Sequence, residues 1–307
     1  MTDQGRRDRG LNEEDLSERG AGSPPSAHGE SGHGIERILV ALDPSEHSLA
    51  ALDAASRMAA RLDADLIGLF VEDVNVRRLA ELPFIQEVGL FTATCRRVEV
   101  QRLSRQLRVQ AGVVRRRFIA ATRSIATRCT FREVRGAVAP EVLRVAAEAD
   151  VIVLGKGAWS PFETGRLAPA VRRVLSQAPA STLILRAEAH VELPMRVVYD
   201  GTSLGDKAVA TAAALAEGED GHLTVLLLTD DPDRASRLRT TVRERLAGTD
   251  VEAGFQTLTE ASVSRLAYLV AREERGTLVL PAHGETLEDE ALLNFLDETQ
   301  APVLFIR

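Results

Sequence analysis

The sequence predicts an α/β protein made of two tandem Rossmann-like domains, each a five-stranded parallel open sheet with helices on both faces. Short runs of branched apolar residues alternate with segments of helical period, which is typical of βαβ units. The order strand, Asp-x-Ser/Thr turn, Ala-rich helix, strand occurs twice. The length of 307 residues suits two domains.

The first copy opens at residue 35, after a charged, Gly- and Pro-containing stretch (1–33) that we expect to be a disordered tail. IERILVALD (35–43) predicts a strand that ends at Asp43. Residues 48–64 then place Leu and Ala on one face of a helix, and DLIGLFVED (65–73) predicts a second strand. A strand, a helix and a strand in succession predict parallel, buried strands.

The second copy repeats this opening and the later strands of the first. MRVVYDGTS (195–203), an Ala-rich helix at 207–218 and HLTVLLLTDD (222–231) follow the same order. The closing segments also correspond: 149–157 with 276–284, and 179–186 with 301–307. Repeats on this scale indicate a duplicated domain. We therefore expect domains at 34–189 and 190–307.

Ten strands are expected in all. They lie near 36–42, 66–71, 130–135, 150–154 and 181–186 in the first half, and near 195–199, 222–228, 252–257, 277–280 and 302–306 in the second. In such sheets a ligand binds beyond the carboxyl ends of the strands, where the strand order reverses. Strands one and four of each half should flank that crevice.

The first half carries a long segment (74–129) that the second half lacks. Its stretch 94–118 has a helical pattern, and between Thr92 and Thr130 there are ten arginines and one acid, Glu99. The simplest interpretation is a solvated arginine face over the domain. The alternatives are a surface for an acidic partner or nucleic acid, and a helical dimer arm.

Composition excludes several classes of protein. No apolar run approaches the roughly 18 residues of a membrane helix, and the N-terminus does not resemble a signal peptide. The net charge of −7 argues against a nucleic-acid coat. Cys95 and Cys129 do not make a disulfide framework, so we expect a reducing cytoplasm.

The residues at the strand ends resemble those of a known family. The strand ILVALD, the serine two residues after its Asp, the DVIVLG strand and the final apolar strand after Ala-Pro are similar to universal stress proteins, over about residues 35–307 in two copies. The resemblance implies an adenine nucleotide alpha hydrolase-like fold and dimerisation through the last strand. It also implies a role in stress response or regulation rather than catalysis, and, in one branch, ATP binding.

The ATP-binding branch carries Gly-x-x-Gly, nine residues, then Gly-Ser or Gly-Thr, because glycines let backbone N–H groups close on phosphate. Here Gly155 matches, but Ala158 and the pair Ala168-Pro169 replace the others. The resemblance places Asp43 near ribose and metal, and Val71 near adenine. The candidate site for ATP or another adenine nucleotide with Mg²⁺ is Asp43, Val71, Gly155, Lys156, Gly157, Gly165 and Arg166.

The second half lacks the phosphate loop. Pro281 replaces the first glycine, and Asp289-Glu290 stand where Gly-Ser would be, so like charge should repel phosphate. Asp200 is best explained as a turn residue, an interpretation that remains open for Asp43 as well.

Other groups of polar residues are weaker candidates for a catalytic or metal site. A triad of Asp43, Ser45 and His47 is unexpected because a turn entering a helix rarely brings such groups onto one oxygen. The pairs His283/Glu285 and His190/Glu192 supply too few ligands for zinc. We therefore expect no enzyme.

The expected function is a cytoplasmic, non-catalytic stress or regulatory protein, with adenine nucleotide binding in the first domain. The alternative is an interaction module that has lost its nucleotide and acts through the basic segment on an unidentified protein partner. The last strands, STLILR and PVLFIR, should mediate a homodimer or pair within the chain as a pseudo-dimer.

Overall fold

The computed structural model describes residues 34–81, 86–88, 95–97, 100–159, 166–187, 189, 191, 194–217, 221–258, 276–282 and 290–307. The expected tail at 1–33 lies outside them. The elements are β1 (Arg37–Leu42), α1 (Glu46–Leu62), β2 (Asp65–Asp73), α2 (Val74–Glu81), β3 (Gln86–Val88), β4 (Cys95–Arg97), α3 (Val100–Ala121), β5 (Cys129–Gly136), α4 (Val138–Ala146), β6 (Val151–Gly155), α5 (Pro169–Gln177), β7 (Ser181–Leu185), β8 (Met195–Tyr199), α6 (Ser203–Ala216), β9 (His222–Leu228), α7 (Pro232–Arg245), β10 (Glu252–Leu258), β11 (Thr277–Pro281), α9 (Glu290–Glu298) and β12 (Val303–Ile306).

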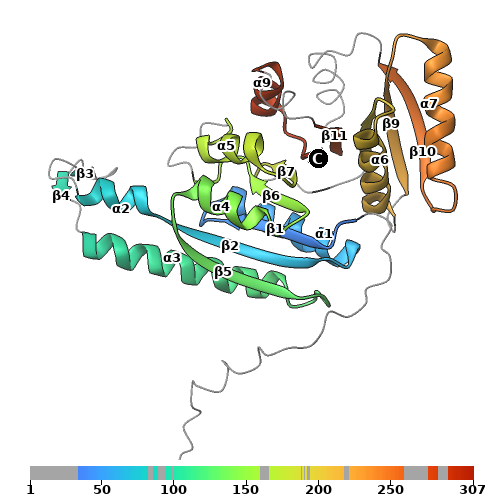
Figure 1. Ribbon diagram of the computed structural model, residues 1–307. Coiled ribbons are helices and arrows are strands. Elements are labelled where there is room, and N and C mark those ends of the chain that lie inside the picture. Colours follow the sequence, from blue (N-terminus) through green and yellow to red (C-terminus); the bar gives the residue numbers. More distant parts are fainter. Residues whose placement is uncertain are drawn as a thin grey trace, which may run out of the picture. The chain divides into compact units, whose positions relative to one another are not determined.

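One ten-stranded sheet runs through both halves, in the order β10-β9-β8-β11-β12-β7-β6-β1-β2-β5 (Figure 1). Within each half the five strands are parallel and follow the same relative order. The α/β fold with a mostly parallel open sheet is confirmed, and each of the ten expected strands is present. The expected domain border at 189/190 falls in the connection between β7 and β8.

The two last strands meet in the middle of this sheet. β12 pairs with β7 in the antiparallel direction, with Val303 opposite Ile184 and Phe305 opposite Thr182. β7 also pairs with β6, and β12 with β11, so each last strand has neighbours on both sides. The edge strands of the sheet are β5 and β10.

Helices cover both faces of the sheet (Figure 1). Buried side chains of α1, α3, α6 and α7 form the core on one face. Those of α4, α5 and α9 form the core on the other. The fully buried strand β6 is therefore apolar along its whole length, as expected for a parallel sheet between two helical layers. β7 is also fully buried and is polar only at Ser181 and Thr182.

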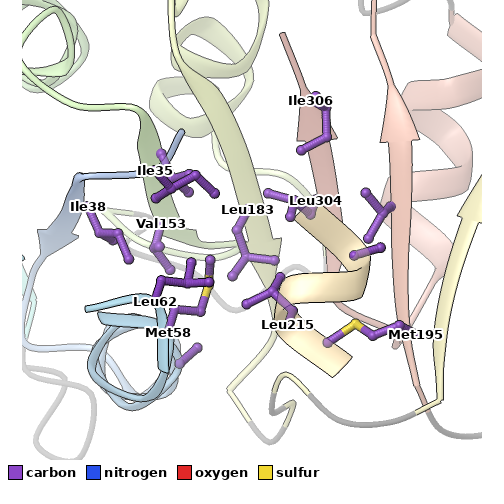
Figure 2. Close-up of a cluster of buried hydrophobic side chains, with 14 of the residues drawn as sticks. Ile35, Ile38, Met58, Leu62, Val153, Leu183, Met195, Leu215, Leu304 and Ile306 are labelled. Carbon is purple, nitrogen blue, oxygen red and sulfur yellow. The ribbon is translucent and has the colours of Figure 1, made fainter. Parts of the chain in front are cut away.

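Both cores continue from one half into the other. Met58 and Leu62 of α1 lie close to Leu183 of β7, and Leu215 of α6 and Leu304 of β12 complete the contact from the second half (Figure 2). Each of these side chains is nearly or fully buried. The seam between the halves is thus a hydrophobic core.

Polar contacts also cross the seam at the end of the chain. The guanidinium of Arg307 donates to the carbonyl oxygens of Leu175 and Ala178, where α5 ends. Burial lowers the pKa of Arg307. Arg61 of α1 donates to the carbonyl of Leu215 in α6. A cation at a helix C-terminus satisfies carbonyls that lack an intrahelical partner.

The segment 74–129 differs from the expected insertion. Its helix, α3, is the crossover that joins the parallel neighbours β2 and β5, just as α7 joins β9 and β10. The part without a counterpart is α2 and the antiparallel pair β3–β4. Residues 95–97, expected to be helical, form β4, because three-residue strands leave no periodic signal in the sequence.

The inner side of α3 packs onto the sheet. Ala111, Val114 and Phe118 are buried, and Phe118 lies so close to Gly68 of β2 that a Cβ there would meet its ring at 2.5 Å. Phe118 also contacts Phe131 of β5, with ring centroids 5.6 Å apart.

Among the described helices, none combines the length and the apolar character needed to cross a bilayer.

Candidate functional site

The strand order of the first half reverses between β1 and β6. From β1 the chain proceeds outward to β2 and β5, and from β6 it proceeds the other way to β7. The carboxyl ends of β1 and β6 lead into the Asp43 turn and the Gly155 loop, so the structure brings these two segments together. This is the crevice position that open parallel sheets offer to ligands.

The Asp43 carboxylate closes this turn. Oδ1 accepts the backbone N–H of Ser45 at 3.0 Å and its hydroxyl at 2.5 Å. Oδ2 accepts the backbone N–H of Trp159 at 2.6 Å. Ser45 in turn caps α1 by accepting the N–H of Ser48 at 3.2 Å. Asp43 is buried, and its carboxylate joins the two loops of the switch point.

His47 lies over the glycines that the sequence assigned to phosphate. A Cβ on Gly155 would meet the His47 carbonyl oxygen at 2.5 Å, and one on Gly157 would meet His47 Cδ2 at 2.6 Å. These glycines therefore allow close approach of the start of α1. Their expected role toward phosphate stays a prediction. Ser45 donates to Asp43, not to His47, so the contacts do not form a triad.

Trp159 was not singled out from the sequence. It adopts a left-handed backbone with φ of 59°, which is uncommon for a bulky residue and marks a constrained position. Among the described residues, its indole Nε1 is buried without a hydrogen-bond partner, and so is Nδ1 of His47. The only available signal was that the chain's single tryptophan follows the glycine loop.

Lys156 does not serve as a free anion ligand of the loop. Its side chain is 2% exposed, and Nζ donates to the Asp297 carbonyl of α9 at 2.7 Å. Burial, together with the nearby Arg186, lowers the pKa of Lys156 to about 8, although Asp297 opposes the shift. The ammonium is thus bonded to the second half, and its expected role in an anion cradle stays a prediction.

The remaining candidate residues are dispersed. Val71 is buried in β2 beside Val134 of β5. Arg166 is exposed, and Gly165 lies outside the described residues, as do both His/Glu pairs. At the start of α5, Ala168 donates its N–H to the Lys156 carbonyl at 3.1 Å, and Pro169 has no N–H to offer. No group of three metal-ligating side chains occurs among the residues described.

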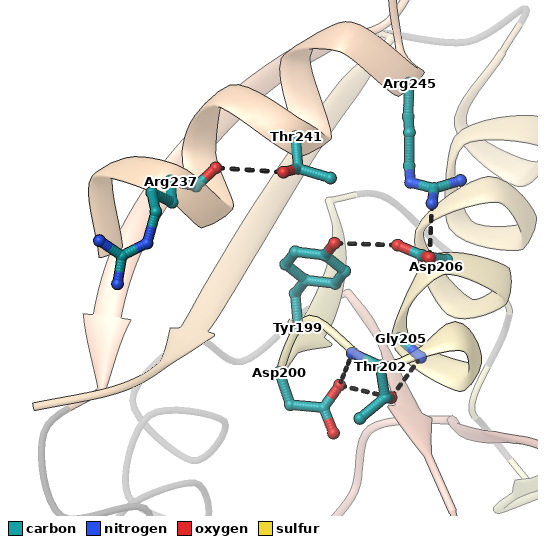
Figure 3. A network of polar contacts seen from close by, with 8 residues as sticks. All are labelled: Tyr199, Asp200, Thr202, Gly205, Asp206, Arg237, Thr241 and Arg245. Carbon is teal, nitrogen blue, oxygen red and sulfur yellow. Dashed lines mark hydrogen bonds and ion pairs between the residues drawn. The ribbon is translucent and has the colours of Figure 1, made fainter. Parts of the chain in front are cut away.

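The second half repeats the turn of the first. Asp200 Oδ1 accepts the N–H of Thr202 at 2.9 Å and its hydroxyl at 2.7 Å (Figure 3). The Thr202 hydroxyl then caps α6 by accepting the N–H of Gly205 at 3.1 Å. The interpretation of Asp200 as a turn residue agrees with these contacts.

A polar network beside this turn is specific to the second half. The Tyr199 hydroxyl donates to Asp206 Oδ1 at 2.9 Å, and Arg245 of α7 bonds the other carboxylate oxygen (Figure 3). Burial, reinforced by Asp206, raises the pKa of Tyr199 to about 12. A phenol with this pKa stays protonated and joins β8, α6 and α7 as a fixed donor.

The outer side of α3 is strongly basic. The helix contains no acid, and its six arginines are all exposed: Arg102, Arg105, Arg108, Arg115, Arg116 and Arg117. Val109 and Ile119 are 65% and 47% exposed on the same helix. We call this surface, made by the six arginines with Val109 and Ile119, the arginine face.

Fold and site together define an α/β protein with a duplicated Asp-x-Ser/Thr turn at the switch point of an open parallel sheet. The family model described as "Universal stress protein family" matches residues 34–186. The chain belongs to the universal stress protein family, as its turn and strand-end residues indicated.

Solved structures share the fold over most of the chain. A universal stress protein from Archaeoglobus fulgidus DSM 4304 is 15% identical with a TM-score of 0.62, covering 88% of this chain and 96% of that one. A protein of unknown function from Pseudomonas aeruginosa PAO1 is 14% identical with a TM-score of 0.54, covering 89% and 93%. No curated protein matches the sequence.

Proposed function

We propose that this chain is a non-catalytic, regulatory member of its family that works through protein contacts and does not depend on a bound nucleotide. The observation that carries the proposal is the Asp43 carboxylate, whose two oxygens accept three donors from Ser45 and Trp159. A carboxylate satisfied in this way has little to gain from a ribose or a metal ion.

The loop glycines support the same proposal. His47 packs against the α-carbons of Gly155 and Gly157, and the N–H groups of Lys156 and Ala158 in this loop already donate to the carbonyls of Leu185 and Gly155. Fewer backbone donors are therefore left for a phosphate. The start of α5 offers a phosphate few donors, because Pro169 has no N–H and Ala168 has no hydroxyl.

Thermal unfolding with ATP, ADP and AMP, each with Mg²⁺, tests this function. A ligand that binds the native state raises its apparent stability, by about 2.7 kcal/mol at a hundredfold excess over Kd. We expect no nucleotide-specific shift in the wild-type protein. A saturable shift that Asp43→Ala abolishes would overturn the proposal.

Adenine nucleotide binding is the second candidate, and one observation favours it. His47 Nδ1 and Trp159 Nε1 are buried beside the switch point without partners among the described residues. Buried polar atoms of this kind are usually satisfied by a water or a ligand. Thermal unfolding with the same nucleotides distinguishes the two candidates. If a nucleotide binds to these atoms, it should give a saturable shift in the unfolding temperature, and Trp159→Phe should weaken that shift.

The arginine face is the surface we propose for the protein partner. Arginine dominates it, and exposed Val109 and Ile119 give it apolar character. A protein segment with acidic and apolar side chains complements both features, whereas the chain's net charge of −7 disfavours nucleic acid.

A fluorescent polyglutamate peptide is a suitable probe for that surface. We expect Arg116→Ala/Arg117→Ala to weaken its binding severalfold, with less effect at high salt. The control Arg132→Ala/Arg135→Ala removes two arginines that are already paired with Glu148 and Glu72, so it should bind as wild type does. Stronger binding of a DNA duplex than of the peptide would contradict an acidic protein partner.

We also propose that the antiparallel pairing of β7 and β12 takes the place of dimerisation through last strands, making the chain a pseudo-dimer. Sedimentation velocity tests this, and a stable dimer that is lost only when β12 is altered would contradict it.

The low cysteine content supports a cytoplasmic location. Fractionation of cells with an antibody against the chain checks it.

A further inference from the structure

The outer side of α3 has the residue spacing of a helix that packs against a second helix. Arg105, Val109, Gly112, Arg116 and Ile119 follow one another at steps of four, three, four and three residues. This is the heptad spacing, which keeps successive side chains on one line along a helix. We call these five residues the α3 stripe. It runs for about 21 Å along the helix.

The α3 stripe points away from the sheet. At about 100° per residue, it lies opposite the side of the helix on which Ala111, Val114 and Phe118 are buried. Val109 and Ile119 are 65% and 47% exposed, so two branched apolar side chains stand on the outer side. One exposed apolar residue is ordinary, but two on the same heptad line are typical of a surface that binds a helix.

Gly112 lies at the middle of the stripe and leaves it bare. Apart from the helix itself, the described atom within 4 Å of a Cβ at this position is Nη1 of Arg116, at 3.6 Å. Glycine inside a helix lowers its stability relative to alanine, and packing onto the sheet does not explain it here because the position faces outward. A position without a side chain lets a second backbone approach closely.

The charge of α3 determines the chemistry of the second helix. α3 has six arginines and no acid. Two copies of α3 packed stripe to stripe would bring Arg105 and Arg116 of both chains together, so like charge disfavours a second copy. A helix with leucines on its contact line and glutamates beside them complements the stripe. The leucines would meet Val109 and Ile119, and the arginine stems would pass over them to reach the carboxylates.

We infer that the α3 stripe binds one acidic amphipathic helix of a protein partner, laid along α3. The inference rests on the protein-contact function proposed above and specifies the form in which the acidic segment is recognised. A short helix rich in glutamate is marginal in water, so the partner segment folds as it binds. Recognition then requires heptad spacing of the apolar residues as well as negative charge.

Two acidic peptides of about 21 residues, three heptads long, test the inference. The heptad peptide has leucine at both contact positions of each heptad and glutamate at most other positions. The shuffled peptide has the same composition without helical periodicity. Fluorescence anisotropy with the full chain should give at least about tenfold tighter binding of the heptad peptide. Circular dichroism should show that this peptide gains helix when it binds.

Substitutions in the stripe separate apolar contact from charge. Val109→Gln/Ile119→Gln removes the two apolar side chains and keeps every arginine. It should bind the heptad peptide about tenfold more weakly and the polyglutamate peptide as the wild type does. The matched control is Val76→Gln, which changes a 40% exposed valine of α2 and should bind both peptides as the wild type does. Because these positions are exposed and glutamine is a good helix former, the variants should fold.

The outcomes distinguish this inference from the function on which it rests. Equal affinity for the heptad and shuffled peptides, or binding without a gain of helix, would overturn the helix and leave an acidic protein partner in place. Binding of neither these peptides nor polyglutamate would contradict the proposed protein contact itself. Tighter binding of a DNA duplex than of the heptad peptide at equal salt would also overturn the inference and assign the stripe to nucleic acid.

Discussion

At the scale of single residues, two equivalent aspartates have different environments. Asp43 and Asp200 both accept the N–H and the hydroxyl of the residue two positions on. Asp43 alone also accepts the Trp159 N–H and is buried, whereas Asp200 is half-buried. The same turn therefore holds two loops together in the first half and mainly starts a helix in the second.

This difference predicts unequal losses of stability. Asp43→Ala leaves three donors in a buried turn without an acceptor, so we expect it to lower the free energy of unfolding by about 3 kcal/mol. Asp200→Ala should lower it by about 1 kcal/mol, typical of a lost turn or cap interaction. Urea denaturation of both variants measures the difference. Equal losses would contradict a stabilising role for the hydrogen bond between Asp43 and the Trp159 N–H.

Lys156 predicts a pH dependence. Its pKa is lowered from 10.5 to about 8, so between these pH values the unfolded chain holds a proton that the folded chain has lost. Unfolding then takes up a proton, and the stability should rise with pH through this window, by at most about 3 kcal/mol.

The variant Lys156→Met tests this assignment. It should flatten the rise in the free energy of unfolding between pH of about 8 and 10.5. Lys207→Met, which changes the only other lysine, should keep it. Urea titrations across this pH range measure both, and a rise that persists in Lys156→Met would show that another group is responsible.

At the scale of elements, α3 shows how one helix serves two purposes. Its inner side packs Val114 and Phe118 against the sheet, and its outer side carries the arginine face. As the crossover between β2 and β5, the helix is anchored by the core. The arginine face is therefore presented on a fixed element, which reduces the entropy lost on binding a partner.

The contact of α3 with β2 predicts a position-specific glycine effect. Gly68→Ala places a Cβ 2.5 Å from the buried Phe118 ring, so we expect a loss of about 1–3 kcal/mol through overpacking. Gly254→Ala, in the edge strand β10 with no atom within 4 Å of its Cβ, should be neutral or stabilising. Urea denaturation compares them, and a neutral Gly68→Ala would mean that α3 moves freely.

At the scale of the whole molecule, the halves share one sheet and two cores. Leu304 of β12 lies opposite Leu183 of β7, and the Arg307 guanidinium donates to the Leu175 carbonyl near the end of α5. Residues 33–307 form one compact unit. Such continuity favours unfolding of both halves together.

Cooperative unfolding can be tested at the seam. Leu304→Ala should lower the stability by about 2–5 kcal/mol, as expected for a cavity at a fully buried leucine. The heat-capacity trace should keep a single peak at lower temperature, as it should for Leu66→Ala, which lies in β2 away from the seam. Two resolved peaks in Leu304→Ala would show that the halves unfold separately.

The sequence by itself determined the strands and their order along the chain, which is the same in both halves. Apolar period and turn chemistry are local properties, and a parallel sheet between two helical layers makes its strands continuous apolar runs. The same local chemistry identified the Asp43 and Asp200 turns, since an aspartate two residues before a serine or threonine bonds its own turn.

The tertiary structure alone decided what the loop after β6 contacts. Gly155, Gly157 and Lys156 read as phosphate ligands, because glycine and lysine suit both an anion and close packing. Only the folded chain brings His47 over the glycines and Asp297 to the lysine, from 141 positions away. Contacts between residues so far apart depend on the packing of whole elements, and no local pattern encodes them.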